Sequence, residues 1–254
     1  MYTFTKKAVK LRDHPDFDQL GPHLKTMLGG DGLNYSQWSS VVDQVTPKTF
    51  ELLIALSAMN IGTDVTVDDP RSSTGNNPDV IATIDGVRWG FACKLLNTFD
   101  DTSRPKPKTV FDNIAKGVKQ IDAAADVEHG LVIVNAKNAI PHNKFWPIGN
   151  PNGVAQGDPA EYGALQNIGS AVQTLRGIAT ELFDQMEAEV GWQEVLKIFE
   201  NSKARPGAAF FLQTALGVIR NGQVLPTRLL FLEPETDEVG ATVCDRLNQS
   251  LQDQ

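Results

Sequence analysis

The sequence has few of the features that mark several common protein classes. Its 254 residues include only two cysteines, Cys93 and Cys244, too few for a disulfide framework or a cysteine-rich zinc cluster. It contains no apolar run long enough to cross a bilayer, and its N-terminal residues lack the apolar stretch of a secretory signal. We therefore expect a cytoplasmic, reduced protein that has no contact with a membrane.

Several enzyme signatures are also missing. There is no Walker A loop, no GxSxG, no HExxH and no pair of CxxC motifs. The apolar run at 130–135 is not followed by the glycine-rich turn of a dinucleotide-binding fold. Kinase, nicotinamide-dependent and serine hydrolase chemistries therefore have no support.

Basic residues are scarce overall but concentrated in one segment. The chain has 31 acidic and 23 basic residues, a net charge of −8, which disfavours a surface that binds nucleic acid all over. Residues 86–119 nevertheless hold seven lysines and arginines against three aspartates, a net charge of +4. Phosphate contacts are therefore expected from this segment. The candidates are Arg88, Arg104, Lys106, Lys108 and Lys116.

Hydrophobic periodicity predicts an α/β protein with a central mixed sheet flanked by helices. Residues 1–45 are expected to form an irregular or helical region packed on the core, and 46–254 a single domain. The predicted helices are 46–60, 109–125, 160–189, 192–201 and one from 237 to the end. The predicted strands are 63–67, 130–135, the hairpin of 79–84 with 87–95, and the hairpin of 208–219 with 225–232.

The first hairpin predicts a patch of chemically useful positions. Asp85-Gly86 is a typical two-residue turn, so Ile84 should face Val87 and Asp79 should lie opposite position 92. Opposed Cβ atoms lie about 4.5–5.5 Å apart. Position 92 and Lys94 share a face of the strand, whereas Cys93 should point the other way, as a core residue and not a nucleophile.

The pattern of Pro78-Asp79, a hairpin and then Ala92-Cys93-Lys94 resembles the PD-(D/E)xK nuclease superfamily, with some specificity over residues 46–136. The resemblance implies a restriction-endonuclease-like fold and Mg²⁺- or Mn²⁺-dependent hydrolysis of phosphodiesters, most of all in double-stranded DNA. It implies that Asp79 and an acid at position 92 bind the metal. It also implies that Lys94 orients the attacking water. Weaker candidates are Glu51, which would support the metal from the preceding helix, and Gln120 on the following helix.

The sequence departs from the family at its most diagnostic position, where Ala92 replaces the acid. Two explanations remain: a naturally inactive member, or an engineered exchange of an acid for alanine. We favour the engineered exchange, because Pro78, Asp79 and Lys94 are all retained. With alanine at this position we expect a severe loss of cleavage, while nucleic-acid binding persists.

Other interpretations stay open. The chain could be a naturally inactive nuclease-fold subunit that binds nucleic acid or acts as a scaffold. It could act in a phage-defence, restriction or toxin system with a helicase, sensor or immunity protein, or as a homo-oligomer. It could also be an unrelated metal hydrolase or a structural α/β protein. Asp79 would then be a simple strand-start residue, and Lys94 a charged residue that prevents pairing at an exposed strand edge.

Overall fold

The computed structural model describes residues 2–28, 45–69, 75–96, 105–141, 145, 168–220 and 223–253. These residues form seven α-helices, two short 3₁₀ helices and six strands. The helices are α1 (Tyr2–Lys10), α2 (Gly21–Leu28), α3 (Val45–Ile61), α4 (Pro107–Ala123), α6 (Ile168–Val190), α7 (Trp192–Lys197) and α8 (Glu238–Gln252), with η1 (Phe17–Leu20) and η2 (Lys137–Ala139). The strands are β1 (Thr63–Val67), β2 (Val80–Ile84), β3 (Val87–Leu95), β4 (His129–Asn135), β5 (Gly207–Arg220) and β6 (Gln223–Thr236).

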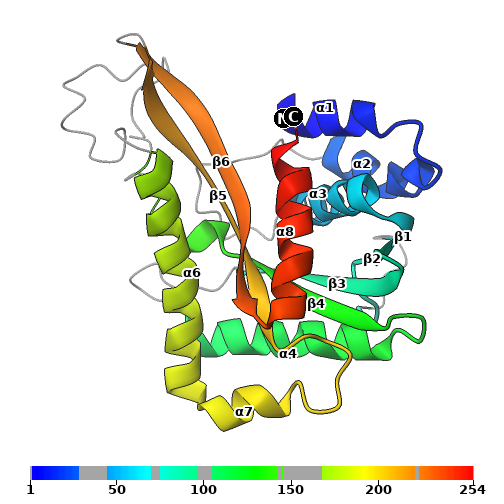
Figure 1. Cartoon of the computed structure of the whole chain (residues 1–254), viewed down its shortest axis with the longest axis vertical. Helices are drawn as coiled ribbons and strands as arrows, with labels where there is room; N and C mark the ends of the chain where they lie inside the picture. The colour runs from blue at the N-terminus through cyan, green and yellow to red at the C-terminus, as the bar shows by residue number, and fades with distance from the viewer. Residues whose placement is uncertain are drawn as a thin grey trace.

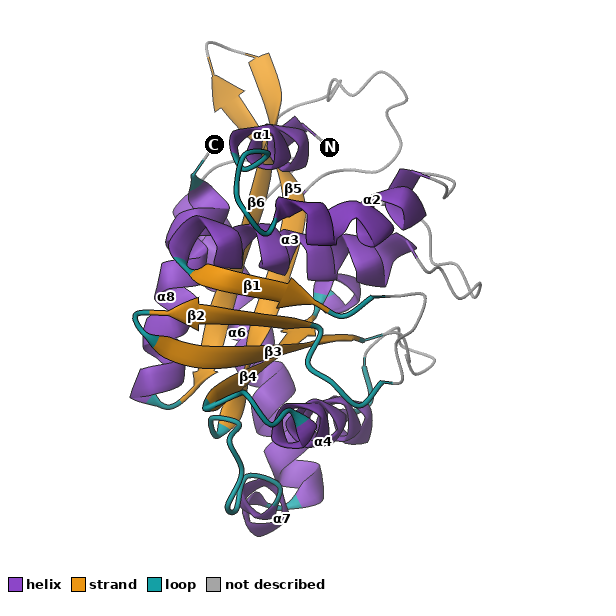
Figure 2. Cartoon of the chain, turned by 90° about the vertical axis from the view of Figure 1, so that its right-hand side faces the viewer, coloured by secondary structure: helices purple, strands orange, loops and turns teal. Residues whose placement is uncertain are grey.

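All six strands belong to one mixed sheet and follow one another in chain order. Figure 2 shows β1 to β4 one below another, with β5 and β6 crossing behind them. β1, β2 and β3 are antiparallel, β4 runs parallel to β3, β5 runs parallel to β4, and β6 returns antiparallel to β5. A parallel pair needs a crossover, and α4 supplies it between β3 and β4. The predicted α/β class with a central mixed sheet is confirmed.

Helices cover both faces of the sheet and enclose two hydrophobic layers (Figure 1). One layer packs α3, α8 and the N-terminal helices against the sheet, and it contains Phe91 and Cys93. The other layer packs α4 and α6 against the opposite face, and it contains Ala92. Successive residues of β3 therefore alternate between the layers, as the period of a strand requires. The predicted inward direction of Cys93, away from position 92, is confirmed.

The β2–β3 hairpin has the predicted register. Ile84 pairs with Val87 across a turn in which Asp85 and Gly86 have φ angles of 51° and 81°. Positive φ at both central residues is the signature of a type I′ turn, whose twist suits a hairpin. The register that continues from this turn brings Asp79, just before β2, to the level of position 92.

The second hairpin is longer than predicted. β5 and β6 have 14 residues each, and β6 runs through Pro226 and Pro234, where periodicity alone suggested shorter strands. Because β6 is an edge strand, a proline on its outer side costs no hydrogen bond within the sheet. Figure 1 shows this pair as a ribbon running between α6 and α8.

The N-terminal residues 2–28 are largely helical and contribute Phe4, Leu11 and Leu20 to the layer around α3. α1 is fixed to the end of α8 by the buried Lys7, whose ammonium group donates to the backbone oxygen of Ser250. Of the helices that the structure describes, none combines the length and apolar character needed to span a bilayer. Residues 160–167 of the predicted helix 160–189 lie outside the described residues.

Candidate active site

Asp79 lies at the start of β2, where the strand meets the second half of β3. The residue is 8% exposed, and its backbone oxygen accepts a hydrogen bond from Asp68 N at 3.0 Å. Its Oδ2 accepts a hydrogen bond of 2.7 Å from the backbone N–H of Cys93 and lies 3.4 Å from Lys94 Nζ. The carboxylate is therefore held by the backbone of the neighbouring strand as well as by a lysine.

Lys94 supplies the cation of the site. Its side chain is 12% exposed, and its Nζ donates to Asp79 Oδ2, to the Cys93 backbone oxygen at 3.1 Å and to Gln120 Oε1. These three oxygens come from the start of β2, from β3 and from α4. An ammonium group has three protons, so the three acceptors match its donors one for one.

Gln120 joins the site to α4 through both ends of its amide. Its Oε1 accepts from Lys94, and its Nε2 donates to the backbone oxygen of Gly75 at 3.0 Å. The helix after the hairpin is therefore fixed to the segment before β2, and the structure brings Gln120, Lys94 and Asp79 together. Lys116 lies one turn earlier on α4, on the same helical face, and is exposed.

Glu51 lies on α3 and is 5% exposed. Its Oε1 and Oε2 accept from Lys48 Nζ at 2.9 and 2.7 Å, and its Oε2 lies 3.0 Å from His23 Nε2. His23 comes from α2 and has no exposed surface. Sequence reasoning missed His23 altogether, because nothing in the local pattern around residue 23 indicates a contact with a helix 28 positions later.

Burial dominates the electrostatics of the two strands. It raises the pKa of the Asp79 carboxyl above its ordinary value; Lys94 opposes this rise, and Glu51 adds to it. Glu51 therefore lies close enough to Asp79 for their charges to interact. Burial also raises the pKa of the Cys93 thiol well above its ordinary value, and Asp79 and Glu51 add to the effect. A thiol held protonated in this way is a poor nucleophile.

Ala92 is fully buried beneath α4, and its methyl side chain offers the site no donor or acceptor. A Cβ built on Gly117 would lie 3.3 Å from the Cβ of Ala92 and 2.8 Å from the methyl groups of Val132. The helix backbone thus approaches β3 and β4 as closely as only glycine allows. The packing around position 92 suits a small side chain.

The described part of the basic segment is spread between the hairpin turn and the beginning of α4. Arg88 lies near the hairpin turn, at the other end of β3 from Lys94, with Nη1 donating to Thr83 Oγ1 at 3.3 Å and to the Asp64 backbone oxygen. Lys106 and Lys108 are exposed at the beginning of α4, where Lys108 pairs with Asp112 at 3.2 Å. Arg104 lies outside the described residues.

A divalent cation does not fit these side chains as they stand. Among the described residues, no three His, Cys, Asp or Glu side chains form a group that could hold a metal ion. Lys48 and His23 engage Glu51, while Lys94 and the Cys93 N–H engage Asp79 Oδ2. Ala92 adds no third carboxylate. Oxygens of the kind that Mg²⁺ prefers are present, but a lysine ammonium group already lies among them.

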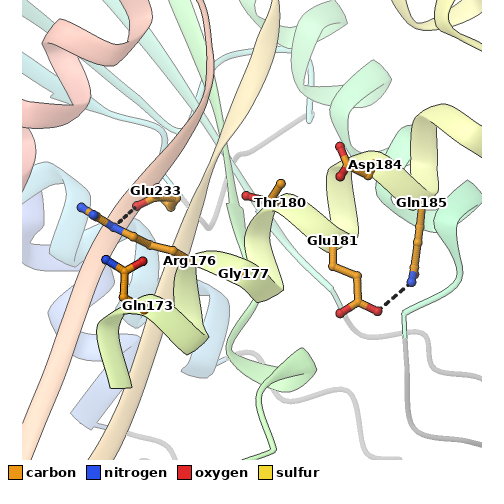
Figure 3. Close-up of a pocket in the computed structure, with 8 residues that line it drawn as sticks. All are labelled: Gln173, Arg176, Gly177, Thr180, Glu181, Asp184, Gln185 and Glu233. Atoms are coloured by element: carbon orange, nitrogen blue, oxygen red, sulfur yellow. Dashed lines mark hydrogen bonds and ion pairs between the residues drawn. The ribbon is translucent and has the colours of Figure 1, made fainter. Parts of the chain in front are cut away.

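A shallow pocket between α6 and β6 is a separate feature (Figure 3). Arg176 Nε pairs with Glu233 Oε2 at 3.0 Å, and Gln185 Nε2 donates to Glu181 Oε1 at 2.8 Å. Burial raises the pKa of Glu233, with Arg176 opposing the rise. Asp184 also lines the pocket, so carboxylates outnumber cations there and the pocket disfavours a phosphate ligand.

Comparisons with family models, with curated proteins and with solved structures each find no match for this chain. The side chains themselves are therefore the basis for any functional conclusion. They bring together Asp79, Lys94 and Gln120, with Glu51 near enough to act on Asp79 through its charge.

Proposed function

We propose that this chain has a restriction-endonuclease-like fold and that it binds nucleic acid at a nuclease-type site without cutting it efficiently. The order of α3, β1, the β2–β3 hairpin, α4 and β4 supports this fold, because the resemblance to the PD-(D/E)xK superfamily covers the same order of elements. The strand pairing supports it as well, with three antiparallel strands followed by a parallel one.

One observation carries the proposal: Asp79, Lys94 and Gln120 meet through hydrogen bonds although they come from three different elements. Burying such charges is costly, so their retention at the positions of the nuclease pattern supports a nuclease-type origin for this site.

The loss of cleavage follows from position 92. A metal-dependent nuclease of this type needs a second carboxylate beside Asp79, and Ala92 provides none. The close approach of Gly117 favours a natural alanine over an engineered exchange, since the surrounding packing already fits the small side chain.

Nucleic-acid contact is assigned to the exposed lysines of α4. Lys116 lies one turn from Gln120, and Lys106 and Lys108 extend the positive charge towards the start of the helix. Such lysines bind the phosphate backbone without reading sequence. Arg88 is excluded from this surface, because its guanidinium is engaged near the hairpin turn.

The test has two parts, binding and cleavage. A labelled DNA duplex should bind the unaltered chain at low salt, and Lys116→Gln should weaken binding, whereas Lys197→Gln on α7 should not. Plasmid DNA with Mn²⁺ should stay uncut with the unaltered chain. Absence of duplex binding by the folded chain would overturn the proposal.

A second candidate is a weak metal-dependent nuclease in which Glu51 replaces the missing strand acid. It is supported by the burial of Glu51 on α3 and by its charge, which adds to the rise in the pKa of Asp79. In that case the unaltered chain would cut plasmid DNA with Mn²⁺, and both Asp79→Asn and Glu51→Gln would abolish cutting. Cutting that survives both substitutions would exclude this site as its source.

A further inference from the structure

Among the described residues, each carboxylate of the site already contacts an ammonium group. Asp79 and Glu51 contribute two carboxylates, and Lys94 and Lys48 contribute two ammonium groups in direct contact with them. All four side chains are at most 15% exposed. A divalent cation added to this cluster would leave two uncompensated positive charges in a place that water hardly reaches.

Lys94 also takes the oxygens that a metal would use. A carboxylate oxygen, a backbone oxygen and an amide oxygen surround its Nζ. Hard cations bind oxygen ligands of this kind. Three such oxygens in one place are costly to bury unless a cation lies among them. Because all three ammonium protons are used, none is left to hold a phosphate or a water molecule.

We propose that the Lys94 ammonium is the resident cation of this site in place of a divalent metal, so that nucleic-acid binding by this chain is independent of metal. The inference rests on the proposed function for its ligand, but the part that concerns Lys94 is tested separately. It assigns Lys94 a cross-linking role among β2, β3 and α4. Contact with phosphate is left to the lysines exposed on α4.

The first experiment uses Mn²⁺ as the probe and thermal unfolding as the readout. The melting temperature of the unaltered chain should not change with Mn²⁺. Lys94→Met frees the three oxygens, so Mn²⁺ at tenfold excess over its dissociation constant should raise the melting temperature of that variant by about 3 °C. The double variant Lys94→Met with Asp79→Asn should lose this response. Lys197→Met, at an exposed lysine of α7, is the matched control and should gain none.

Calorimetric titration of the unaltered chain with Mn²⁺ covers the case in which Lys94→Met does not fold. No binding at millimolar Mn²⁺ supports the inference. Binding that Asp79→Asn abolishes overturns it, as does a folded Lys94→Met variant with no response to Mn²⁺.

Duplex binding is then compared in EDTA and in Mg²⁺ at equal ionic strength. Equal affinities support metal-independent binding, and a tenfold loss in EDTA overturns it. If no duplex binds under either condition, the proposed function fails, while the Mn²⁺ experiments still decide the role of Lys94. The two failures are therefore distinguishable.

Discussion

The Asp79 site and the pocket between α6 and β6 both contain carboxylates beside cations, but among the described residues that line them the two kinds are equal in number only at the site. At the site, the side chains of Asp79 and Lys94 are each 12% exposed, and Lys48 compensates Glu51. In the pocket, Arg176 is half-exposed beside Glu233, and Glu181 and Asp184 also line the wall (Figure 3).

The difference follows from the dielectric surroundings. Water compensates an excess of charge at an exposed pocket, so strict pairing is unnecessary there. A buried carboxylate is not solvated by water, so it must be paired with a cation or protonated. Removing one of the paired charges at the site should therefore leave its partner buried and uncompensated, and destabilise the folded chain.

Lys94→Met should cause the largest loss of stability. It leaves Asp79 buried without its cation, which typically costs about 3–5 kcal/mol of unfolding free energy. Urea unfolding at neutral pH measures the loss. Adding Asp79→Asn should recover part of it, because the uncompensated charge is then gone. A loss below about 1 kcal/mol, the range of an exposed pair, would mean that the site is not insulated from water.

Gly117→Ala tests how closely α4 covers the site. A new Cβ would meet the Val132 methyl groups at 2.8 Å, so the helix must shift, at a cost of about 1–3 kcal/mol. Gly177→Ala, at the pocket, is the matched control: its Cβ meets nothing within 4 Å, and helix propensity should stabilise the chain by about 0.5–1 kcal/mol. Thermal unfolding should show a lower melting temperature for Gly117→Ala and a higher one for Gly177→Ala. Equal effects would contradict the tight packing of α4.

The pH dependence of stability should reveal the buried carboxyl. The pKa of Asp79 is raised by burial above its ordinary value of 3.8, so the folded chain holds this proton when the unfolded chain has released it. Stability from this group is therefore largest at low pH and falls as pH rises from about 3.8 through the folded pKa. Glu233, whose pKa burial also raises, contributes with the same sign.

Unfolding free energies of the unaltered chain and of Asp79→Asn, measured across this pH range, isolate the Asp79 contribution. The unfolding free energy of the Asn variant should fall less steeply with pH, because the Asp79 contribution is gone. The contribution of Glu233 remains in both proteins. Parallel curves would show that Asp79 ionises alike in the folded and unfolded chains.

The smallest effect is expected at the pocket. Arg176→Met removes the partner of Glu233, but the arginine is 51% exposed, and such pairs contribute about 0–1 kcal/mol. Urea unfolding should barely separate this variant from the unaltered chain. A loss as large as that of Lys94→Met would remove the contrast between the two regions.

Much of the local geometry could be predicted from the sequence, because it depends on neighbouring residues. The Asp85-Gly86 turn sets the hairpin register, and the alternation of a strand sets the direction of Cys93. The proximity of Asp79 and Lys94 follows from these two facts. Gln120 could be proposed only through the resemblance, and its contact with Lys94 depends on how α4 packs.

The rest depends on contacts between distant segments. His23 reaches Glu51 only because α2 packs on α3, and no local pattern encodes that contact. Arg88 and Lys94 fall in the same basic segment, yet six residue steps of extended strand place them about 20 Å apart. Charge counts along a chain thus overstate how far basic residues act together.

The most direct test of the account is the affinity of a labelled DNA duplex for the unaltered chain, measured by fluorescence anisotropy in EDTA and in Mn²⁺ at equal ionic strength. The account predicts equal dissociation constants under both conditions and a duplex recovered intact. Binding that requires Mn²⁺, or cleavage of the duplex when Mn²⁺ is added, would contradict it.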